Sequence, residues 1–277
     1  MILIRSHGLG NDYLVLHQYS EKMSKKLAQA LCDRHQGVGA DGILEPIDCD
    51  QADFGVRIWN PDGSIAEKSG NGLRIFAQYL VDHRGVSSPL TISVEGETVT
   101  CSVEPDNVTV NMGAPTFLPQ DIPCQVPLSN NQINIDGTEL NVTAVGMGNP
   151  HCVVFFAKNT DLDQLEWRSW GAQLESDPRF PNRTNVQFAV VVNPHRIIAR
   201  IWERGAGETT ASGSSACAVA AAAIRHRTAH SPIEVSMPGG SVHVTMNAQG
   251  HLVLTGPVEE VGQVHVLNAW IERRIQT

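Results

Sequence analysis

Two short segments of small polar residues each come directly before an apolar stretch that is long enough to form a buried helix. They are Ser69 to Gly72 (Ser-Gly-Asn-Gly) and Ser212 to Ser215 (Ser-Gly-Ser-Ser). The first turn of a helix has unpaired backbone N–H groups and the positive end of the helix dipole, so it attracts a carboxylate or a phosphate. Serine and glycine are also common in plain helix caps, and either segment alone favours that simpler interpretation.

The chain repeats itself, and the repeat relates the two segments to each other. Arg57 to Trp59 recurs as Arg200 to Trp202, and the same shift carries Ser69-Gly70 onto Ser212-Gly213. Self-similarity that extends along much of the chain indicates a tandem duplication. Two helix starts at equivalent positions of two repeats predict a shared site, in which both bind one small anionic ligand.

Each repeat predicts the same order of elements. A β-rich opening leads to a Gly-x-Gly-Asn turn, a first helix, a strand that ends near a repeated arginine, and a second helix that is apolar nearly all round and therefore buried. A β-meander follows, broken at turns that contain glycine, asparagine and proline. The predicted first helices are Ser24 to His35 and Leu162 to Leu174, the strands end near Arg57 and Arg200, and the first meander covers Leu90 to Val94, Thr98 to Val103 and Val108 to Met112.

These patterns predict an α/β (α+β) protein with two lobes related by a pseudo-twofold axis, in each of which a β-sheet wraps around a central buried helix. A chain of 277 residues is long enough for two such lobes. We expect an N-terminal lobe over residues 1–117, a C-terminal lobe over residues 118–262 and a substrate cleft between them. The proline-containing stretch Thr116 to Pro127 is the expected junction.

Charge and composition restrict the partners. A formal charge of -9 argues against nucleic acid or an anionic membrane surface, because both need a basic footprint. The six cysteines form no CxxC pair, which excludes a dense disulfide framework and favours the cytoplasm. The longest apolar run, Ala216 to Ile224, is too short to span a bilayer. No dinucleotide fingerprint, phosphate loop or HExxH motif is present, so we expect no cofactor and no metal.

Several polar residues near the turns are candidates for ligand binding. Four asparagines stand in turns, where asparagine usually makes only local hydrogen bonds; they are Asn11, Asn60, Asn149 and Asn185. Glu203 and Arg204 begin a glycine-rich loop before the second helix start, and this pair suits an ammonium and a carboxylate, although a surface ion pair would explain it equally well. His151 is either an ordinary core histidine or a group that tunes a nearby acid or base.

Six motifs together resemble the diaminopimelate epimerase family, whose members are cofactor-independent amino-acid epimerases, and the resemblance covers essentially the whole chain. The motifs are His7 to Asp12 (HGLGND), Gly37 to Gly42 (GVGADG), Asn60 to Ser64 (NPDGS), Gly70 to Arg74 (GNGLR), Met147 to Val153 (MGNPHCV) and Glu203 to Thr209 (ERGAGET). The resemblance implies an isomerase that interconverts L,L- and meso-diaminopimelate in lysine biosynthesis by two-base proton transfer. It also implies that the last strand, about residues 263–277, joins the N-terminal lobe. A homodimer is compatible with this prediction.

The resemblance further implies a role for each candidate residue. The reacting α-carboxylate of the substrate would accept hydrogen bonds from the backbone N–H groups of Gly70, Asn71, Gly213 and Ser214. The remaining polar groups of the substrate would be bound by Asn11, Asn60, Asn149, Asn185, Glu203 and Arg204. His151 and Glu203 would tune the two bases.

The family's two catalytic cysteines fall on Ser69 and Ser212 in this chain. In the family, one thiolate removes the α-proton while the opposite thiol protonates the other face. A thiol with a reference pKa of about 8.5 can be activated at a helix start, but a hydroxyl is far less acidic, and the roughly 2 kcal/mol that a helix dipole supplies cannot close that gap. Cys152 and Cys217 are expected to be core residues and not substitutes. We therefore expect a bound substrate and impaired catalysis.

Two alternatives remain open. The chain could be a natural relative with different chemistry, such as a racemase, an isomerase or a dehydratase of another amino or hydroxy acid, in which a serine relays a proton. It could also be a non-catalytic protein that keeps the cleft and binds an amino acid there.

Overall fold

The computed structural model describes residues 1–19 and 22–276, and the chain divides into two compact units. The first unit contains Met1–Val110 together with the C-terminal segment that starts at Gly256, and the second contains Asn111–Thr255. The expected lobe limits, residues 117 and 262, lie a few residues beyond these boundaries. In the described part of the chain, no helix is long and apolar enough to cross a membrane.

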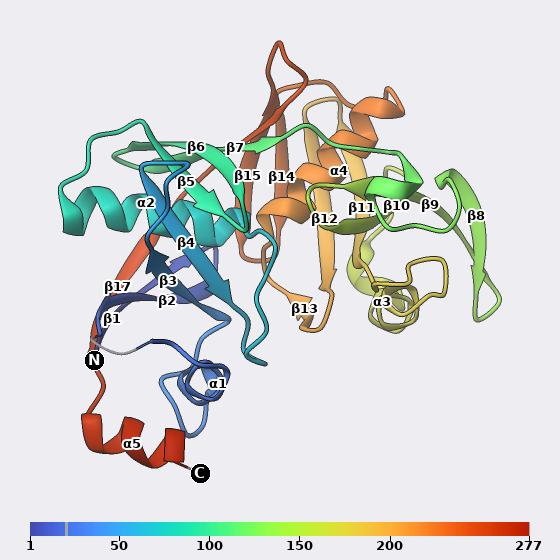
Figure 1. Cartoon of the computed structure of the whole chain (residues 1–277). Coiled ribbons are helices and arrows are strands. Elements are labelled where there is room, and N and C mark those ends of the chain that lie inside the picture. Colours follow the sequence, from blue (N-terminus) through green and yellow to red (C-terminus); the bar gives the residue numbers. More distant parts are fainter. Residues whose placement is uncertain (20–21, 277) are drawn as a thin grey trace. The chain divides into compact units, whose positions relative to one another are not determined.

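The first unit is a sheet with two packed helices and a third at the end of the chain (Figure 1). Its strands are β1 (Ile2–Gly8), β2 (Asn11–Gln18), β3 (Gly42–Ile47), β4 (Phe54–Trp59), β5 (Leu90–Val94), β6 (Glu97–Glu104), β7 (Asn107–Gly113) and β17 (Glu259–His265). Its helices are α1 (Lys25–Cys32), α2 (Gly70–Arg84) and α5 (Asn268–Gln276).

The second unit repeats this composition. Its strands are β8 (Ser129–Ile135), β9 (Thr138–Gly146), β10 (Pro150–Phe156), β11 (Asn185–Asn193), β12 (Arg196–Glu203), β13 (Gly207–Thr209), β14 (Ile233–Met237), β15 (Gly240–Met246) and β16 (Leu252–Gly256). Its helices are α3 (Trp167–Glu175) and α4 (Gly213–Arg225), with the short 3₁₀ helices η1 (Pro119–Asp121) and η2 (Leu162–Gln164).

Strand order and direction are the same in the two units. In the first unit, β17, β1, β2, β3, β4, β5, β6 and β7 are neighbours in that order, and the pairs β2–β3 and β4–β5 are parallel. In the second unit the order is β8, β9, β10, β11, β12, β14, β15 and β16, with β10–β11 and β12–β14 parallel. The remaining pairs in both lists are antiparallel, so the sequence repeat corresponds to a repeated topology.

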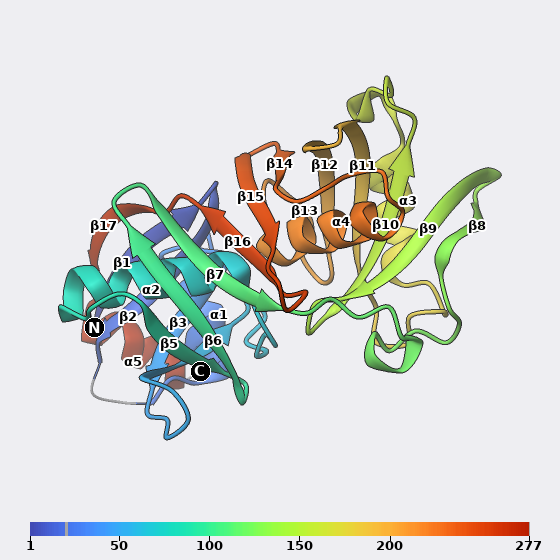
Figure 2. The same cartoon turned by 90° about the horizontal axis from the view of Figure 1, so that it is seen from above.

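A buried helix occupies the centre of each unit, as the apolar composition predicted. Most residues of α2 and nearly all of α4 are buried, and α4 contacts β9, β10, β11, β12, β14 and β15 (Figure 2). Alanines fill much of α4, and these small side chains let strands approach the helix from several sides. The predicted α/β class, with a helix inside the sheet of each repeat, is confirmed.

Two of the predicted helices are shorter than expected because a residue leaves the helical conformation. The first ends at Cys32, since Asp33 turns away and accepts hydrogen bonds from the N–H groups of His35 and Gln36. The second is broken at Leu165, which is extended (ψ 154°) and separates η2 from α3. Each break depends on the conformation or the hydrogen bonds of a single residue, and the spacing of apolar residues in the sequence does not predict it.

The C-terminal segment also differs from the prediction. The last strand, β17, begins at Glu259 and ends at His265, and within the supposed strand 263–277 the residues Asn268–Gln276 form the helix α5. The helix lies beside α1 (Figure 1), and Ile271 is buried there in a core that includes Leu27 and Leu31. Apolar residues at helical spacing, Trp270, Ile271 and Ile275, face this core.

Candidate active site

The α2 helix starts where the sequence placed it, and Ser69 is its N-cap residue. The Ser69 Oγ atom accepts a hydrogen bond from the Gly72 N–H (3.0 Å), and the Tyr13 hydroxyl lies 3.0 Å from the same atom. Tyr13 can sit there because residue 42 is glycine: a Cβ at Gly42 would lie 2.6 Å from the Tyr13 ring. The serine hydroxyl is thus held by two neighbours from different elements.

Asn11 is joined to this helix start through Asn71. The Asn71 Nδ2 donates to Asn11 Oδ1 (2.9 Å), and Asn71 Oδ1 accepts from the buried Arg74 (2.9 Å). On its other side, Asn11 Nδ2 donates to Asp41 Oδ2 (2.8 Å), and Asp41 in turn binds Arg34 (2.6 Å). The structure therefore brings Asn11 and Asn71 together and fixes which way the Asn11 amide points.

Asn60 takes a local role within the part of the chain that the structure describes. It follows β4 in a turn, where its Nδ2 donates to Ser64 Oγ (2.9 Å) and its backbone N–H donates to the Ser64 carbonyl (2.8 Å). Asp62 stabilises the same turn by accepting from the Ser64 hydroxyl (2.6 Å). A role for Asn60 in substrate binding thus stays a prediction.

The α4 helix starts at Gly213, with Ser212 as its N-cap, but this serine makes no side-chain cap hydrogen bond. Ser212 and Ser214 are both buried, and the Ser212 carbonyl accepts the Ala216 N–H in the first helical turn. The two helix starts therefore differ: Ser69 caps its helix, whereas the Ser212 hydroxyl is not used in that way.

A buried hydrogen-bond chain leads from the first turn of α4 to Asn149. Gln187 Nε2 lies 3.0 Å from Ser215 Oγ and 3.0 Å from His151 Nδ1, and His151 Nε2 lies 2.7 Å from Asn149 Oδ1. Burial, together with the nearby charge of Arg204, lowers the pKa of His151 to about 3. His151 is consequently neutral at physiological pH, so it can orient its neighbours but does not supply a charge.

Asn185 and the Glu203–Arg204 loop belong to the same region. Asn185 Oδ1 accepts the Arg204 N–H (3.0 Å), and Asn185 Nδ2 donates to the Pro150 carbonyl (3.0 Å). The loop is also held by Glu175, which accepts the Gly205 N–H (2.7 Å). Within the second unit, the structure thus gathers Asn149, His151, Asn185, Arg204 and the α4 start, and it places Glu203 at the end of β12 beside Arg204.

Neither buried cysteine of this unit replaces the serines. Cys152 lies inside β10 and Cys217 inside α4, and both side chains are fully buried. Burial raises the pKa of the Cys152 thiol far above its usual range. The expectation that both are core residues is confirmed.

Five residues that position the candidates were not assigned a role from the sequence: Tyr13, Asp41, Glu175, Gln187 and Ser215. Ser215 lies in the predicted helix start and Asp41 in the Gly37 to Gly42 motif, and Gln187 is a lone polar residue in the otherwise apolar strand segment Val186 to Val192. The others act through contacts with residues far away in the chain, such as Tyr13 with Ser69.

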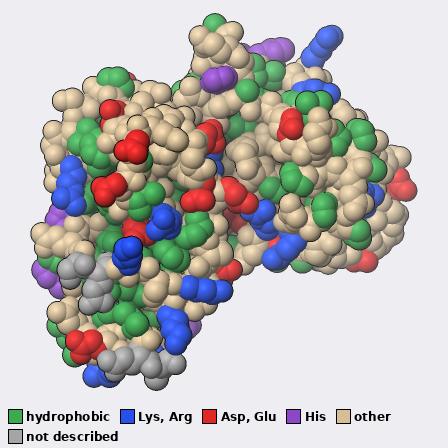
Figure 3. All heavy atoms as spheres, viewed as in Figure 1, with side chains coloured by type: hydrophobic (Ala, Val, Ile, Leu, Met, Phe, Trp, Pro, Cys, Tyr) green, Lys and Arg blue, Asp and Glu red, His purple; other side chains and the backbone are tan. Residues whose placement is uncertain are grey.

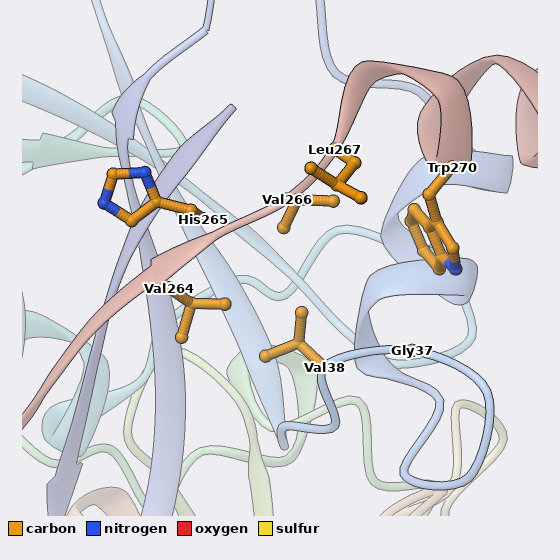
Figure 4. Close-up of a pocket in the computed structure, with 7 residues that line it drawn as sticks. All are labelled: Gly37, Val38, Val264, His265, Val266, Leu267 and Trp270. Carbon is orange, nitrogen blue, oxygen red and sulfur yellow. The ribbon is translucent and has the colours of Figure 1, made fainter.

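A separate pocket of about 220 Å³ in the first unit contains none of the candidate residues (Figure 4). Its lining is mostly apolar and includes Val38, Val264, Val266, Leu267 and Trp270, at the connection between β17 and α5.

In the described part of the chain, no group of three or more His, Cys, Asp or Glu side chains is placed to hold a metal ion. Both acidic and basic side chains are exposed on the face drawn in Figure 3.

Comparison with known proteins decides the family. The family profile of diaminopimelate epimerase matches residues 3–118 and 143–261. The chain belongs to the diaminopimelate epimerase family. Diaminopimelate epimerase of Pseudomonas fluorescens is 40% identical over 273 residues, which cover 95% of this chain and 98% of that protein. The enzyme of Desulfitobacterium hafniense is 36% identical over 275 residues, with 94% and 96% covered.

Among solved structures, a probable proline racemase from Agrobacterium radiobacter superposes with a TM-score of 0.72 and covers 96% of this chain and 93% of its own. Its sequence is only 13% identical, so this likeness concerns the fold alone. Family membership confirms the resemblance and the classification as a cofactor-independent isomerase of the diaminopimelate epimerase type.

Proposed function

We propose that this chain binds diaminopimelate at the α2 and α4 helix starts and epimerises it much more slowly than it would with cysteine at positions 69 and 212. The reaction interconverts the L,L and meso forms and belongs to lysine biosynthesis. One observation carries the proposal: two units of equal topology each begin their central helix with a serine, and each start is hydrogen-bonded to an asparagine expected to bind substrate. These links are Asn71 with Asn11 and, through Gln187 and His151, Ser215 with Asn149.

The carboxylate role follows from the helix starts themselves. The N–H groups of Gly70, Asn71, Gly213 and Ser214 belong to the first turns of α2 and α4. Backbone N–H groups in the first turn of a helix are suited to bind an anion. Both starts carry the positive end of a helix dipole. They would together hold the α-carboxylate, and Asn11, Asn149, Asn185, Glu203 and Arg204 would bind the remaining polar groups, with Asn60 as a further ligand.

The catalytic deficit follows from the hydroxyl groups. A general base works best when its pKa lies near the working pH, and each unit of mismatch corresponds to about 1.4 kcal/mol. The pKa of a serine hydroxyl lies many units above that of a thiol. A helix dipole stabilises the charged form by at most about 2 kcal/mol, which is too little to close this difference. Ser69 and Ser212 are therefore suited to donate hydrogen bonds to the substrate and poorly suited to remove its α-proton.

Solvent exchange tests this proposal. The chain and the double variant Ser69→Cys/Ser212→Cys are incubated with L,L- and meso-diaminopimelate in deuterated water, and deuterium at the α-carbon is measured by mass spectrometry. We expect exchange and inversion to rise by on the order of a thousandfold or more in the double variant. Each single cysteine variant is the control, since inversion needs an acid and a base on opposite faces. Absence of exchange in the double variant would falsify the proposal.

The comparisons do not favour the alternative chemistries, because relatives that are 36% and 40% identical carry the same family name over almost their full length. We propose the cytoplasm as the compartment, since none of the six cysteines forms a disulfide in the described part of the chain, as expected in a reducing environment. A homodimer stays a prediction, which light scattering on the purified chain would test.

A further inference from the structure

Gln187 is a fully buried amide on β11, in a strand whose neighbouring residues are apolar. Its Nε2 atom lies 3.0 Å from His151 Nδ1 and 3.0 Å from Ser215 Oγ, and both of these partners are fully buried as well. A buried amide is costly unless it is hydrogen-bonded, so a glutamine at this position needs a reason.

The orientation of the Gln187 amide follows from counting which of its hydrogen-bond donors and acceptors have partners. With Nε2 towards His151 and Ser215, both amide protons are used, and only the Oε1 atom is buried without a hydrogen-bond partner. The reverse orientation would leave two buried N–H donors unpaired instead of one acceptor. Unpaired buried carbonyls are also better tolerated than unpaired N–H groups. Gln187 therefore donates to His151 Nδ1.

This donation sets the tautomer of His151. A neutral imidazole has one N–H and one acceptor nitrogen. Since Nδ1 accepts from Gln187, the proton resides on Nε2, and the Nε2–H donates to Asn149 Oδ1 (2.7 Å). Burial and the charge of Arg204, which lower the pKa of His151, keep the ring from gaining a second proton.

Asn149 receives its orientation from His151 in turn. Its Oδ1 atom is occupied by the imidazole N–H, and its NH₂ group is the end that points away from His151. Asn149 is only half-buried, unlike the three residues behind it. The amide donors of Asn149 are therefore the group that this chain offers to a ligand.

We propose that Gln187 is a positioning residue which, through the tautomer of His151, holds Asn149 with its NH₂ group towards the ligand, so that this part of the site selects an acceptor such as a carboxylate. The identity of the ligand rests on the proposed function, whereas the tautomer does not. Ser215, in the first turn of α4, completes this arrangement because its Oγ atom accepts the second hydrogen bond of the Gln187 amide.

Nitrogen NMR of the full chain, labelled with ¹⁵N-histidine, tests the tautomer without any ligand. The His151 signals are assigned by comparison with His151→Gln. We expect a pyridine-type Nδ1 and a protonated Nε2 throughout about pH 5 to pH 8, the range in which an ordinary histidine titrates. In Gln187→Glu the new carboxylate only accepts, so Nδ1 should become protonated. A protonated Nδ1 in the unaltered chain would overturn the inference.

A double-mutant cycle tests the transmission to Asn149. Gln187→Met keeps the side-chain length but lacks the amide, and we expect it to weaken diaminopimelate binding roughly fivefold, as for one misaligned hydrogen bond. In the Asn149→Ala background the same change should have no further effect, because Gln187 acts through Asn149. Equal losses in both backgrounds would indicate a structural role and overturn the proposal.

The two experiments separate this inference from the proposed function. If the unaltered chain does not bind diaminopimelate, the proposed function fails, while the NMR result still decides the tautomer. If the chain binds diaminopimelate but His151 is protonated on Nδ1, the function stands and the role of Gln187 fails. Urea unfolding of Gln187→Met shows whether the fold is kept, and Gln187→Glu supplies the spectroscopic result if it is not.

Discussion

At the scale of single residues, side chains with no direct part in proton transfer determine how the polar groups of the site are presented. Asp41 is the clearest case in the first unit, because it accepts a hydrogen bond from the Asn11 amide and pairs with Arg34. Asn71 donates to the other end of the same amide. Asn11 is therefore fixed from both sides, which leaves its second Nδ2 proton as its free donor.

Removing the Asp41 carboxylate should release Asn11. We expect Asp41→Ala to weaken diaminopimelate binding by about tenfold or more, since a hydrogen bond to a charged group is worth roughly 1.5–3 kcal/mol. Isothermal titration calorimetry measures this affinity. Asp33→Ala is the matched control, since Asp33 is an exposed acid in the same loop whose side chain accepts hydrogen bonds from the backbone N–H groups of His35 and Gln36 and not from Asn11. Equal losses in the two variants would contradict the role of Asp41.

Gly42 is needed because of the ring that lies against it. A Cβ at this position would be 2.6 Å from the Tyr13 ring and 2.7 Å from the Trp59 carbonyl oxygen. We expect Gly42→Ala to lower the free energy of unfolding by about 1–3 kcal/mol and to move Tyr13 away from Ser69. Urea denaturation gives the first quantity and tyrosine NMR the second. Gly85→Ala is the control variant, because a Cβ at this position meets no atom within 4 Å. Any loss of stability in this variant comes from the left-handed backbone conformation and not from a steric clash.

The residues of the site divide into those that sequence can predict and those that it cannot. Ser69 and Ser212 were predictable as helix caps, since capping depends on residues within one turn. Gln187, Asp41 and Tyr13 were not, because each acts on a residue from another element: Gln187 on His151 and Ser215, Asp41 on Asn11, and Tyr13 on Ser69. Such pairings exist only once the strands are in register.

At the scale of elements, the two central helices are equivalent in sequence but not in how they are capped. The Ser69 hydroxyl accepts the Gly72 N–H, whereas Ser212 makes no side-chain cap hydrogen bond. A serine that does not cap its helix is available for another role, so the α4 start is the one at which the hydroxyl itself is better placed to meet a ligand.

This difference predicts unequal effects of the same substitution. Ser69→Ala should lower the free energy of unfolding by about 1 kcal/mol, because one N–H of the first turn loses its partner. Ser212→Ala should change it by less than about 0.5 kcal/mol. Urea unfolding followed by circular dichroism measures both variants, and each serves as the control for the other. A larger loss for Ser212→Ala would show that its hydroxyl has a structural role.

Element boundaries were predictable where a glycine or proline marks a turn, and less so elsewhere. The meander was placed to within one or two residues, since β5, β6 and β7 end at the predicted turns. The break at Leu165 and the helix α5 were missed. Leu165 has no breaker residue beside it, and α5 is stabilised by packing of Ile271 against α1, which lies more than two hundred residues earlier in the chain.

At the scale of the whole molecule, the first unit has the full set of repeated strands only because the C-terminal strand β17 joins it. In the second unit β8 pairs with β9, and in the first unit β17 pairs with β1 at the corresponding place. β17 thus takes the same place beside β1 in the first unit that β8 takes beside β9 in the second. Local patterns could not show this pairing, and only the resemblance to the family suggested it.

Protonation links the buried hydrogen-bond chain to the stability of the whole fold. In the folded chain the pKa of His151 is lowered to about 3, mainly by burial, while the unfolded chain has the ordinary value of 6.5. Burial also lowers the pKa values of His17 and His226. The unfolded chain therefore takes up protons below pH 6.5 that the folded chain does not, and the free energy of unfolding falls as the pH drops through this window.

Acidic groups affect the free energy of unfolding in a lower pH range. Burial opposes the charge of Asp12, but hydrogen bonds from Arg34 and Arg5 lower its pKa below the ordinary value of 3.8. The contribution of Asp12 to stability is therefore present above that value and is lost as the pH falls through the lowered pKa. Between pH 6.5 and about pH 5.5, above the ordinary pKa values of the carboxyl groups, the histidines therefore dominate the slope and Asp12 has little influence.

The substitution His151→Gln isolates the part due to this residue. Glutamine can accept from Gln187 and donate to Asn149 without a titrating group, so it preserves the hydrogen-bond chain. We expect the unaltered chain to lose stability between pH 6.5 and pH 4 more steeply than the variant, by up to about 1.4 kcal/mol per pH unit, the value for one proton. Urea unfolding at several pH values measures both slopes. Parallel curves would mean that His151 is protonated in the folded chain, and would remove the reason for a neutral imidazole between Gln187 and Asn149.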